Sequence, residues 1–327
     1  MTSPGSRVSS GWSGIRRVAE RLKDGLRNGP VDAPVASRFP IRLVVLDLDG
    51  TLIGADFGIG PRTQAAVRSA RGRGVDVAIA TGRMPSSAMV FAGPLGLTAP
   101  LIGYQGALIR TMPPPGRRLG RILVHTPLAA TVAREVIAWS RLRGLDPHLN
   151  HLERFIIRAD DPMLDDYSRF TGARAVLVPD YNAIDHPVTK ILAPGEEPLV
   201  AAALVEARVA FAGRAMVTIS HPRFLEFAAA GVSKGRAVRW LARRLGVPLE
   251  QTMAIGDERN DLEMIAAVGH GVAMPTAPNE VRSVARYVAA PLEDEGAAQM
   301  IEALVLAGRA APANAERLRR QLRSGAA

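Results

Sequence analysis

The sequence predicts an α/β protein in which a doubly wound parallel sheet carries an inserted α+β domain. Short apolar runs at 43–46, 75–80 and 252–255 each end in polar residues, as buried parallel strands do. A helical pattern over 61–72 joins the first two runs with β–α–β spacing, which predicts parallel neighbours. Between about 109 and 221 the pattern changes to mixed strands and helices.

The core domain is therefore expected to be discontinuous, with residues 40–108 and 222–307 as its two parts. The helix over 61–72 opens at Pro61, because proline is favoured in the first helical turn. A short helix near 86–92 and a strand at 99–103 complete the first part, and the prolines of 113–116 predict a hinge out of it. The second part is expected to begin with an apolar segment at 224–227 and then to alternate between helices at 234–244, 262–268, 278–286 and 295–306 and strands at 252–255, 271–274 and 287–290.

The inserted domain, 109–221, is long enough to fold around its own core. Strands and helices are expected at 122–124, 128–143, 155–157, 162–170, 175–178, 188–192, 196–211 and 216–219. No catalytic pattern stands out within these elements.

Composition limits the possible chemistry and location. The chain has 327 residues and no cysteine, which excludes a disulfide framework, a thiolate nucleophile and a Cys-zinc site. No apolar run approaches the ~18 residues that span a bilayer, and the N-terminus lacks the apolar stretch of a signal peptide. We therefore expect a cytoplasmic protein.

The formal charge of +10 is concentrated at the two ends. Residues 1–39 hold seven basic and three acidic side chains, and residues 308–327 hold five and one, so each end has a net charge of +4. We expect a basic N-terminal extension with a linker and a basic C-terminal tail. Their charge predicts at most weak contact with anionic surfaces, and no specific nucleic-acid partner. The N-terminal segment reads as a weak helix on its own domain or, alternatively, as a basic amphipathic helix for a membrane or partner.

Lysine is rare in this chain. Only Lys23, Lys190 and Lys234 occur among 41 basic residues, so arginine supplies most of the positive charge. A lysine in the body of the protein is then expected where a compact ammonium group fits and a planar guanidinium does not. Lys190, in the strand at 188–192, is expected to pair with Asp185 or Glu196, or alternatively to reach a site in the core from the inserted domain.

Two carboxylates follow the first buried strand, at Asp47 and Asp49. The carboxyl end of such a strand is where open α/β sheets bind ligands, and residues two apart in an extended chain face the same way. Two neighbouring carboxylates on one face repel each other, and Mg²⁺ removes this repulsion because it binds oxygen ligands of both. A turn of Asp and Gly without chemistry is the alternative, but the full pattern of apolar strand and Asp-x-Asp-Gly-Thr favours a metal-assisted site.

Three other segments are expected to reach the same sheet edge. Thr81-Gly82-Arg83 follows the second strand, and a hydroxyl beside free backbone N–H groups suits phosphate oxygens. Lys234 follows the N-cap candidate Ser233, where the helix dipole disfavours a cation, so a functional role is indicated. The segment 256–261 places Asp257, Asn260 and Asp261 after a further buried strand.

These segments together resemble the haloacid dehalogenase (HAD) superfamily of phosphotransferases. The order of DLDGTL at 47–52, TGR at 81–83, VSKG at 232–235 and GDERND at 256–261 is similar to that of its Cof-type phosphatases. In these enzymes a large cap is inserted between the second and third motifs. The resemblance covers about 41–306 and implies a Rossmann-like core.

The resemblance implies a role for each matching residue. Asp47 is implied as the nucleophile that forms an aspartyl-phosphate, and Asp49 as the general acid and then base. Mg²⁺ is implied to bind a carboxylate oxygen of Asp47, the backbone carbonyl of Asp49 and Asp257, with Asp261 supporting the metal shell. The residues implied to grip the phosphoryl group are Thr81, Gly82, Lys234 and Asn260.

The chain departs from the family pattern in loops around the site. The segment Tyr104-Gln105-Gly106 has glutamine where the family usually has asparagine. Such departures leave the substrate open more than the chemistry. The lead hypothesis is Mg²⁺-dependent hydrolysis of a small phosphorylated metabolite, such as a sugar phosphate or a nucleotide-like phosphate. A phosphomutase with the same nucleophile, or a tethering protein that binds membrane or nucleic acid through its basic ends, is the alternative, and the oligomeric state is open.

Overall fold

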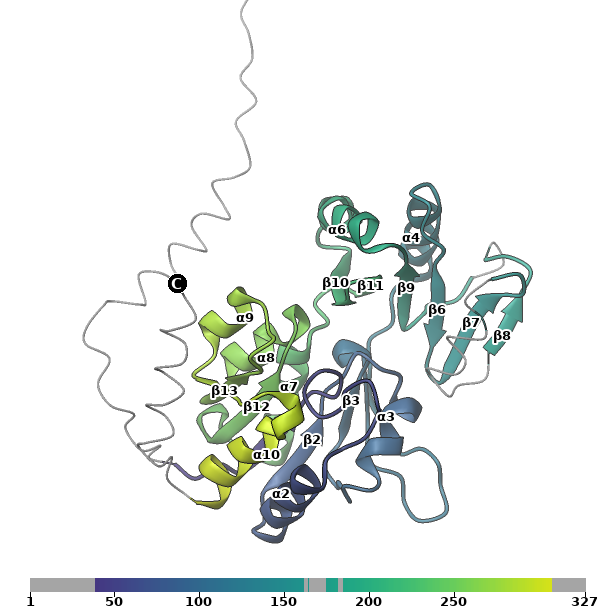
Figure 1. The fold of residues 1–327 in the computed structure, drawn as a ribbon. Coiled ribbons are helices and arrows are strands. Elements are labelled where there is room, and N and C mark those ends of the chain that lie inside the picture. The colour runs from purple at the N-terminus through teal and green to yellow at the C-terminus, as the bar shows by residue number, and fades with distance from the viewer. Residues whose placement is uncertain (1–38, 162–163, 165–174, 182–184, 308–327) are drawn as a thin grey trace, which may run out of the picture. The chain divides into compact units, whose positions relative to one another are not determined.

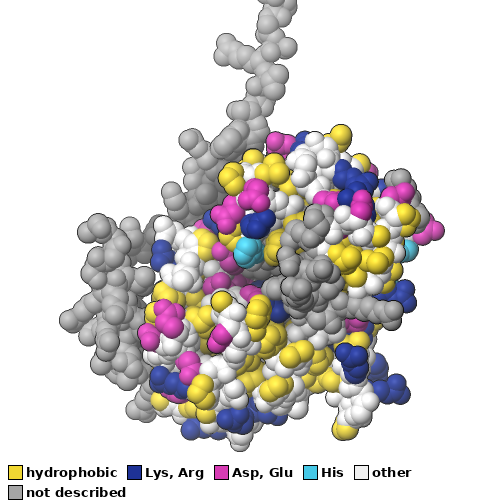
Figure 2. Space-filling view, turned by 45° about the vertical axis from the view of Figure 1, so that its right-hand side comes forward, with side chains coloured by type: hydrophobic (Ala, Val, Ile, Leu, Met, Phe, Trp, Pro, Cys, Tyr) yellow, Lys and Arg dark blue, Asp and Glu magenta, His cyan; other side chains and the backbone are white. Residues whose placement is uncertain are grey.

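The structure is a computed structural model that describes residues 39–161, 164, 175–181 and 185–307. The predictions for the two basic ends fall almost entirely outside these residues, as does most of the helix expected at 162–170. Among the described residues, no helix is long and apolar enough to cross a membrane. The side chains on the face seen in Figure 2 intermix acidic, basic and apolar types.

The core sheet has five parallel strands in the order β14-β13-β12-β1-β2. Pairing of β1 with β2 in register, Leu43 opposite Asp76, confirms the predicted β–α–β unit. The strands, seen in Figure 1, are β1 (Leu43–Leu46), β2 (Asp76–Ile79), β12 (Thr252–Gly256), β13 (His270–Ala273) and β14 (Tyr287–Val288).

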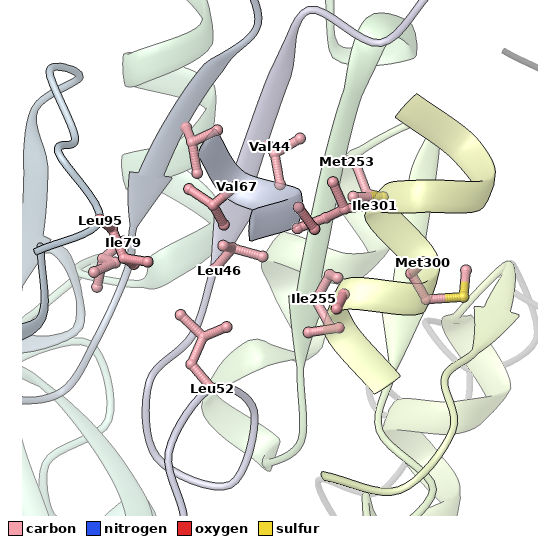
Figure 3. Packing of buried hydrophobic residues seen from close by; sticks show 14 of the residues in the cluster. Val44, Leu46, Leu52, Val67, Ile79, Leu95, Met253, Ile255, Met300 and Ile301 are labelled. Atoms are coloured by element: carbon pink, nitrogen blue, oxygen red, sulfur yellow. The ribbon is translucent and has the colours of Figure 1, made fainter. Parts of the chain in front are cut away.

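Helices cover both faces of this sheet, because alternate strand residues point to opposite sides. Val44 and Leu46 pack with α2 (Pro61–Gly72), α3 (Pro85–Ala92) and α10 (Gly296–Ile301), as Figure 3 shows for Val67 and Ile301. Leu43 and Val45 pack with α7 (Lys234–Leu245), α8 (Leu262–Ala267) and α9 (Asn279–Val284). Burying each such side chain contributes about 1.5–3 kcal/mol, so this two-sided core holds the strand ends in place.

The cap is built on a second sheet of six strands in the order β10-β11-β9-β6-β7-β8. One face packs on α4 (Ala130–Arg141) and α6 (Glu197–Ala210), and the other contacts Met84 and Tyr104 of the core. The strands are β6 (His148–His151), β7 (Arg154–Arg158), β8 (Ala175–Val178), β9 (Lys190–Pro194), β10 (Ala215–His221) and β11 (Phe224–Ala229).

The predicted domain boundaries are wrong at both ends of the cap. The strand expected in the cap at 122–124 is β5 (Ile122–His125), which pairs with β4 (Leu108–Arg110) beside β3 (Leu101–Gly103). The prolines of 113–116 therefore lie in the loop of this hairpin and not at a hinge. At the other end, β11 pairs with β9 and β10, so the expected boundary at 221/222 splits an antiparallel strand pair. Turn residues alone do not tell a hairpin from a domain crossing.

Four short helices complete the described residues. They are the 3₁₀ helices η1 (Tyr104–Gly106), η2 (Leu249–Gln251), η3 (Arg259–Asp261) and η4 (Leu292–Asp294). The C-terminal element η5 (Glu302–Leu306) continues α10 as a π-helix. The helix expected over 295–306 is thus α10 followed by this wider turn, while β6 was not anticipated because its polar residues hide the strand pattern.

Candidate active site

Asp47 lies directly beyond β1, at the carboxyl edge of the core sheet. Its backbone N–H donates to the carbonyl of Ile255 at 3.0 Å, and the residue is only 4% exposed. Gly50 then turns the chain with a φ of 77°, and a side chain there would collide with the carboxylate of Asp257. Glycine at this position therefore lets two carboxylate segments approach each other closely.

Lys234 is the first residue of α7, and its helix is capped by Ser233, which accepts a hydrogen bond from the N–H of Arg236 at 3.2 Å. The Lys234 ammonium lies 2.7 Å from Asp47 Oδ1 and 2.6 Å from Asp261 Oδ1. Burial lowers the pKa of Lys234, but the carboxylates of Asp261 and Asp47 outweigh burial and raise the pKa above its usual value. These carboxylates thus offset the unfavourable helix dipole that the sequence pointed to.

Asp257 and Asp261 join the same cluster from the loop after β12. Asp261 Oδ2 accepts the N–H groups of Asp257 at 3.0 Å and Glu258 at 3.1 Å. Thr51 Oγ1 donates to Asp257 Oδ1 at 3.1 Å. Burial, and then the charge of Asp261, raise the pKa of Asp257 to about 7. Burial and the same neighbour also raise the pKa of Asp47 well above its usual range.

The three carboxylates have the chemistry of a metal site. One ligand atom from each of Asp47, Asp257 and Asp261 lies within 4.8 Å of the others. Asp261 already accepts from Lys234 and from two backbone N–H groups. Asp47 and Asp257 are therefore better suited to bind a hard cation directly, while Asp261 orients the lysine and the loop.

Asp49 departs from the expected arrangement, because its side chain does not join this cluster. Arg83 donates to both carboxylate oxygens of Asp49, from Nε at 2.8 Å and from Nη2 at 2.5 Å, and the Asp49 side chain is 47% exposed. The guanidinium also lies 5.4 Å from the ring centroid of Phe57 and 5.5 Å from that of Phe91. The strand ends at Leu46, so strand alternation no longer sets the direction of Asp49.

The phosphate-binding candidates occupy two loops of the same edge. Thr81 is fully buried, and its hydroxyl oxygen accepts the N–H of Arg83 at 3.1 Å, which closes the turn. The amide of Asn260 donates to Gln105 Oε1 at 3.1 Å, and its carbonyl oxygen has no hydrogen-bond partner among the described residues. The Thr81 hydroxyl oxygen is thus engaged within its own turn, whereas Asn260 keeps an oxygen that a ligand could use.

A cavity of about 720 Å³ lies between the carboxyl edge of the core and the cap. Of the predicted site residues, Asp47, Asp49, Gly82, Lys234 and Asn260 line this cavity. Thr81, Asp257 and Asp261 are not among the residues that line it. Apolar side chains form much of the remaining wall: Ile53, Phe57, Met84, Tyr104, Leu192 and Phe224.

The cap contributes polar residues that the motifs did not reveal. Lys190 reaches into the cavity, as the alternative hypothesis had it, but pairs with Glu226 at 2.8 Å, so the expected partners Asp185 and Glu196 are wrong. Asn150, opposite Lys190 on the neighbouring strand, is 1% exposed, and its Nδ2 has no hydrogen-bond partner among the described residues. The rarity of lysine was the only sequence signal for this group.

Comparisons with known proteins agree with this geometry. A family model described as haloacid dehalogenase-like hydrolase matches residues 44–301. A putative phosphatase of Streptococcus pyogenes is 29% identical, in an alignment that covers 81% of this chain and 99% of that protein. An HMP-PP phosphatase of Serratia proteamaculans is 31% identical, and the alignment covers 74% of this chain and 87% of that protein. A solved haloacid dehalogenase-like hydrolase from Bacteroides thetaiotaomicron is 25% identical, with a TM-score of 0.70 over 81% of this chain and 99% of its own. The chain therefore belongs to the haloacid dehalogenase-like hydrolases and is a phosphatase of the Cof type.

Proposed function

We propose that the protein hydrolyses a small phosphorylated metabolite, a sugar phosphate or a nucleotide-like phosphate, with Mg²⁺ and through an aspartyl-phosphate. The observation that carries this proposal is the buried contact of 2.7 Å between the Lys234 ammonium and Asp47 at the wall of the cavity. A carboxylate is a competent nucleophile toward phosphorus only where cations offset the repulsion between two anions.

In the first half-reaction a carboxylate oxygen of Asp47 attacks phosphorus, and the bond from phosphorus to the leaving oxygen breaks. Asp49 donates a proton to the departing alkoxide, which requires its carboxylate to separate from Arg83 and to take up a proton from solvent beforehand. In the second half-reaction Asp49 accepts a proton from water, the water oxygen attacks phosphorus, and Asp47 is released with inorganic phosphate.

Mg²⁺ fits the donor set, with Asp47, Asp257 and the backbone carbonyl of Asp49 proposed as its ligands. When bound, it would neutralise charge between the carboxylate and the phosphoryl oxygens. The chain's own residues have the other roles. Lys234 favours the ionised form of Asp47 and holds it in place, Asp261 orients Lys234, and Gly82 and Asn260 bind phosphoryl oxygens. The buried Thr81 hydroxyl would act mainly by shaping the turn that carries Gly82.

The far side of the cavity is proposed to bind the leaving group. Its apolar wall suits a ring or a carbon chain, and the Asn150 amide offers a buried donor. Leaving such a donor without a partner costs about 1–3 kcal/mol, which a substrate acceptor would recover. The name of the Serratia relative puts HMP-PP on the panel of compounds to test.

The direct test is hydrolysis of an aryl phosphate with and without Mg²⁺, by the intact chain and by Asp47→Asn. We expect Mg²⁺-dependent release of phosphate that the substitution abolishes. Activity that survives Asp47→Asn would refute the assignment of the nucleophile. Interconversion of sugar-phosphate isomers without release of phosphate would identify a mutase instead.

A further inference from the structure

A continuous chain of hydrogen bonds runs from one proposed phosphate-binding loop to the other by way of the cap. Lys190 Nζ donates to the carbonyl of Gly82 at 3.0 Å and to Glu226 Oε1 at 2.8 Å. Gln105 Nε2 donates to Glu226 Oε2 at 3.1 Å, and Asn260 donates to Gln105 Oε1 at 3.1 Å. Two core loops far apart in sequence are thus joined through an ion pair that belongs to the cap.

The geometry of the cap sheet makes this connection possible. Lys190 lies on β9 and Glu226 on β11, and they are diagonal neighbours because Lys190 is paired with Ala228 and Leu192 with Glu226. Such neighbours share one face of the sheet. Both are at most 5% exposed, and Ser220 Oγ donates a further hydrogen bond to Glu226 Oε1 at 2.5 Å. Contacts within the cap therefore hold Lys190 and Glu226 in place, in addition to their contacts with the core.

Gln105 is held equally firmly on the core side. It is 1% exposed and has a φ of 60°, next to Tyr104 with a φ of 50°. Non-glycine residues in this region of backbone conformation are strained and persist where surrounding contacts hold them there. Its backbone N–H donates to the carbonyl of Thr81 at 3.0 Å, which ties it to the same turn as Gly82.

We propose that Lys190, Glu226 and Gln105 form a positioning relay, through which docking of the cap sets the positions of Gly82 and Asn260 around the phosphoryl group. This inference rests on the proposed function, because it takes those two residues as phosphate ligands. The three relay residues act through their neighbours and need not touch the leaving group. Their effect is therefore on binding of the phosphoryl group, whatever alcohol carries it.

The relay makes a prediction that a substrate-contact role does not. Displacing a positioned group by about 1 Å costs up to about 100-fold in rate. A broken relay should thus lower kcat/KM by a similar factor for every leaving group, and should weaken binding of inorganic phosphate in parallel. A Lys190 that contacts the leaving group would instead change the ranking of substrates.

The test compares Lys190→Met/Glu226→Gln, which removes both charges together, with Gln105→Met, which cuts the chain without leaving a charge unpaired. The matched control is Arg143→Met, which removes a cap ion pair with Glu206 at 2.8 Å. The measurements are kcat/KM for an aryl and an alkyl phosphate, the affinity for inorganic phosphate, and hydrogen exchange of the backbone around residues 81–84.

We expect the double variant to lose about tenfold to 100-fold in kcat/KM on both substrates, Gln105→Met to lose several-fold, and both to exchange faster around Gly82. The control should behave as the unsubstituted chain. Exchange and kcat/KM that stay unchanged in both variants, or a loss confined to one leaving group, would overturn the relay. Hydrogen exchange around Gly82 can be measured without any turnover. If the unsubstituted protein were inactive, the proposed function would be refuted, and the exchange rates of the variants would still test the relay.

Discussion

The two walls of the cavity differ in how their charges balance. At the core edge, three buried or half-buried carboxylates, Asp47, Asp257 and Asp261, surround one ammonium, that of Lys234. On the cap face, Lys190 and Glu226 are matched one to one. A surplus of buried negative charge raises the pKa of the carboxyl groups and attracts a cation, whereas a balanced pair only fixes geometry. We therefore propose that the core wall carries the chemistry and that the cap wall positions it.

The largest effect is expected from Lys234→Met, because it removes the ammonium group that contacts Asp47 and Asp261. Activity should fall by a factor on the order of 1000 or more, since Asp47 and the phosphoryl group lose their shared counter-charge. Stability should fall by about 3–5 kcal/mol at neutral pH, because buried carboxylates are left unpaired. Aryl phosphate hydrolysis and urea denaturation measure the two losses.

The matched control is Arg239→Met, on the exposed side of the same helix. It should leave both quantities nearly unchanged. Equal behaviour of the two variants would show that the buried ammonium has no special place in the site.

Asp49→Asn should have the next largest effect, and one that depends on the leaving group. An alkyl phosphate needs a proton at the departing oxygen, so its hydrolysis should slow by about 100-fold or more, and a nitrophenyl phosphate should be affected less in the first step. Rates for both substrates measure the difference, with Asp56→Asn in the same loop as control. The same loss for both esters in the first step would contradict an acid role.

The surplus of carboxylates at the core edge also determines how Mg²⁺ binding should depend on pH. The pKa of Asp257 is about 7, because burial and Asp261 disfavour its charge, so below pH 7 a proton competes with the cation. The apparent Mg²⁺ affinity should rise by about tenfold per pH unit up to pH 7 and then level off. Calorimetric titration at several pH values measures this, and a flat profile would contradict it.

Stability of the metal-free protein should change in the opposite direction. A carboxyl group with a raised pKa binds its proton more tightly when folded, so the folded state is favoured at low pH and loses that advantage as pH rises from about 4 to about 7. Denaturation across this window, with Asp257→Asn for comparison, isolates the contribution of this group.

The smallest effect is expected from Asn150→Leu on the cap wall. Loss of one buried donor should change the ratio of kcat/KM between leaving groups with and without a hydrogen-bond acceptor by a few-fold to about tenfold. A panel of phosphate esters measures the ratio. A uniform loss across the panel would place Asn150 with the positioning residues instead.

The core wall was largely predictable because its polar residues follow apolar strands in compact motifs. Asp47, Asp257 and Asp261 converge because parallel strands bring their carboxyl ends to one edge. The position of Lys234 followed from a broken helix-dipole preference. The sequence could not show that Arg83 holds Asp49, because that pairing depends on loop geometry beyond the strand.

The cap wall was mostly hidden for the opposite reason. Asn150, Lys190 and Glu226 are single polar residues on antiparallel strands, without a motif around any of them. Strand pairing decides which of them meet, and neither β6 nor the place of β11 in the cap sheet was predicted. Only the rarity of lysine singled out Lys190, and it did not name Glu226 as the partner.

The most direct test of the central claim is to trap the phosphoryl group on the enzyme. The protein is mixed with an aryl phosphate and Mg²⁺, quenched in acid within the first turnover, digested, and analysed by mass spectrometry. We predict phosphate on the peptide that contains Asp47, and none on that peptide from Asp47→Asn. Rapid hydrolysis with phosphate on another residue, or with none bound at any time during turnover, would contradict attack by Asp47.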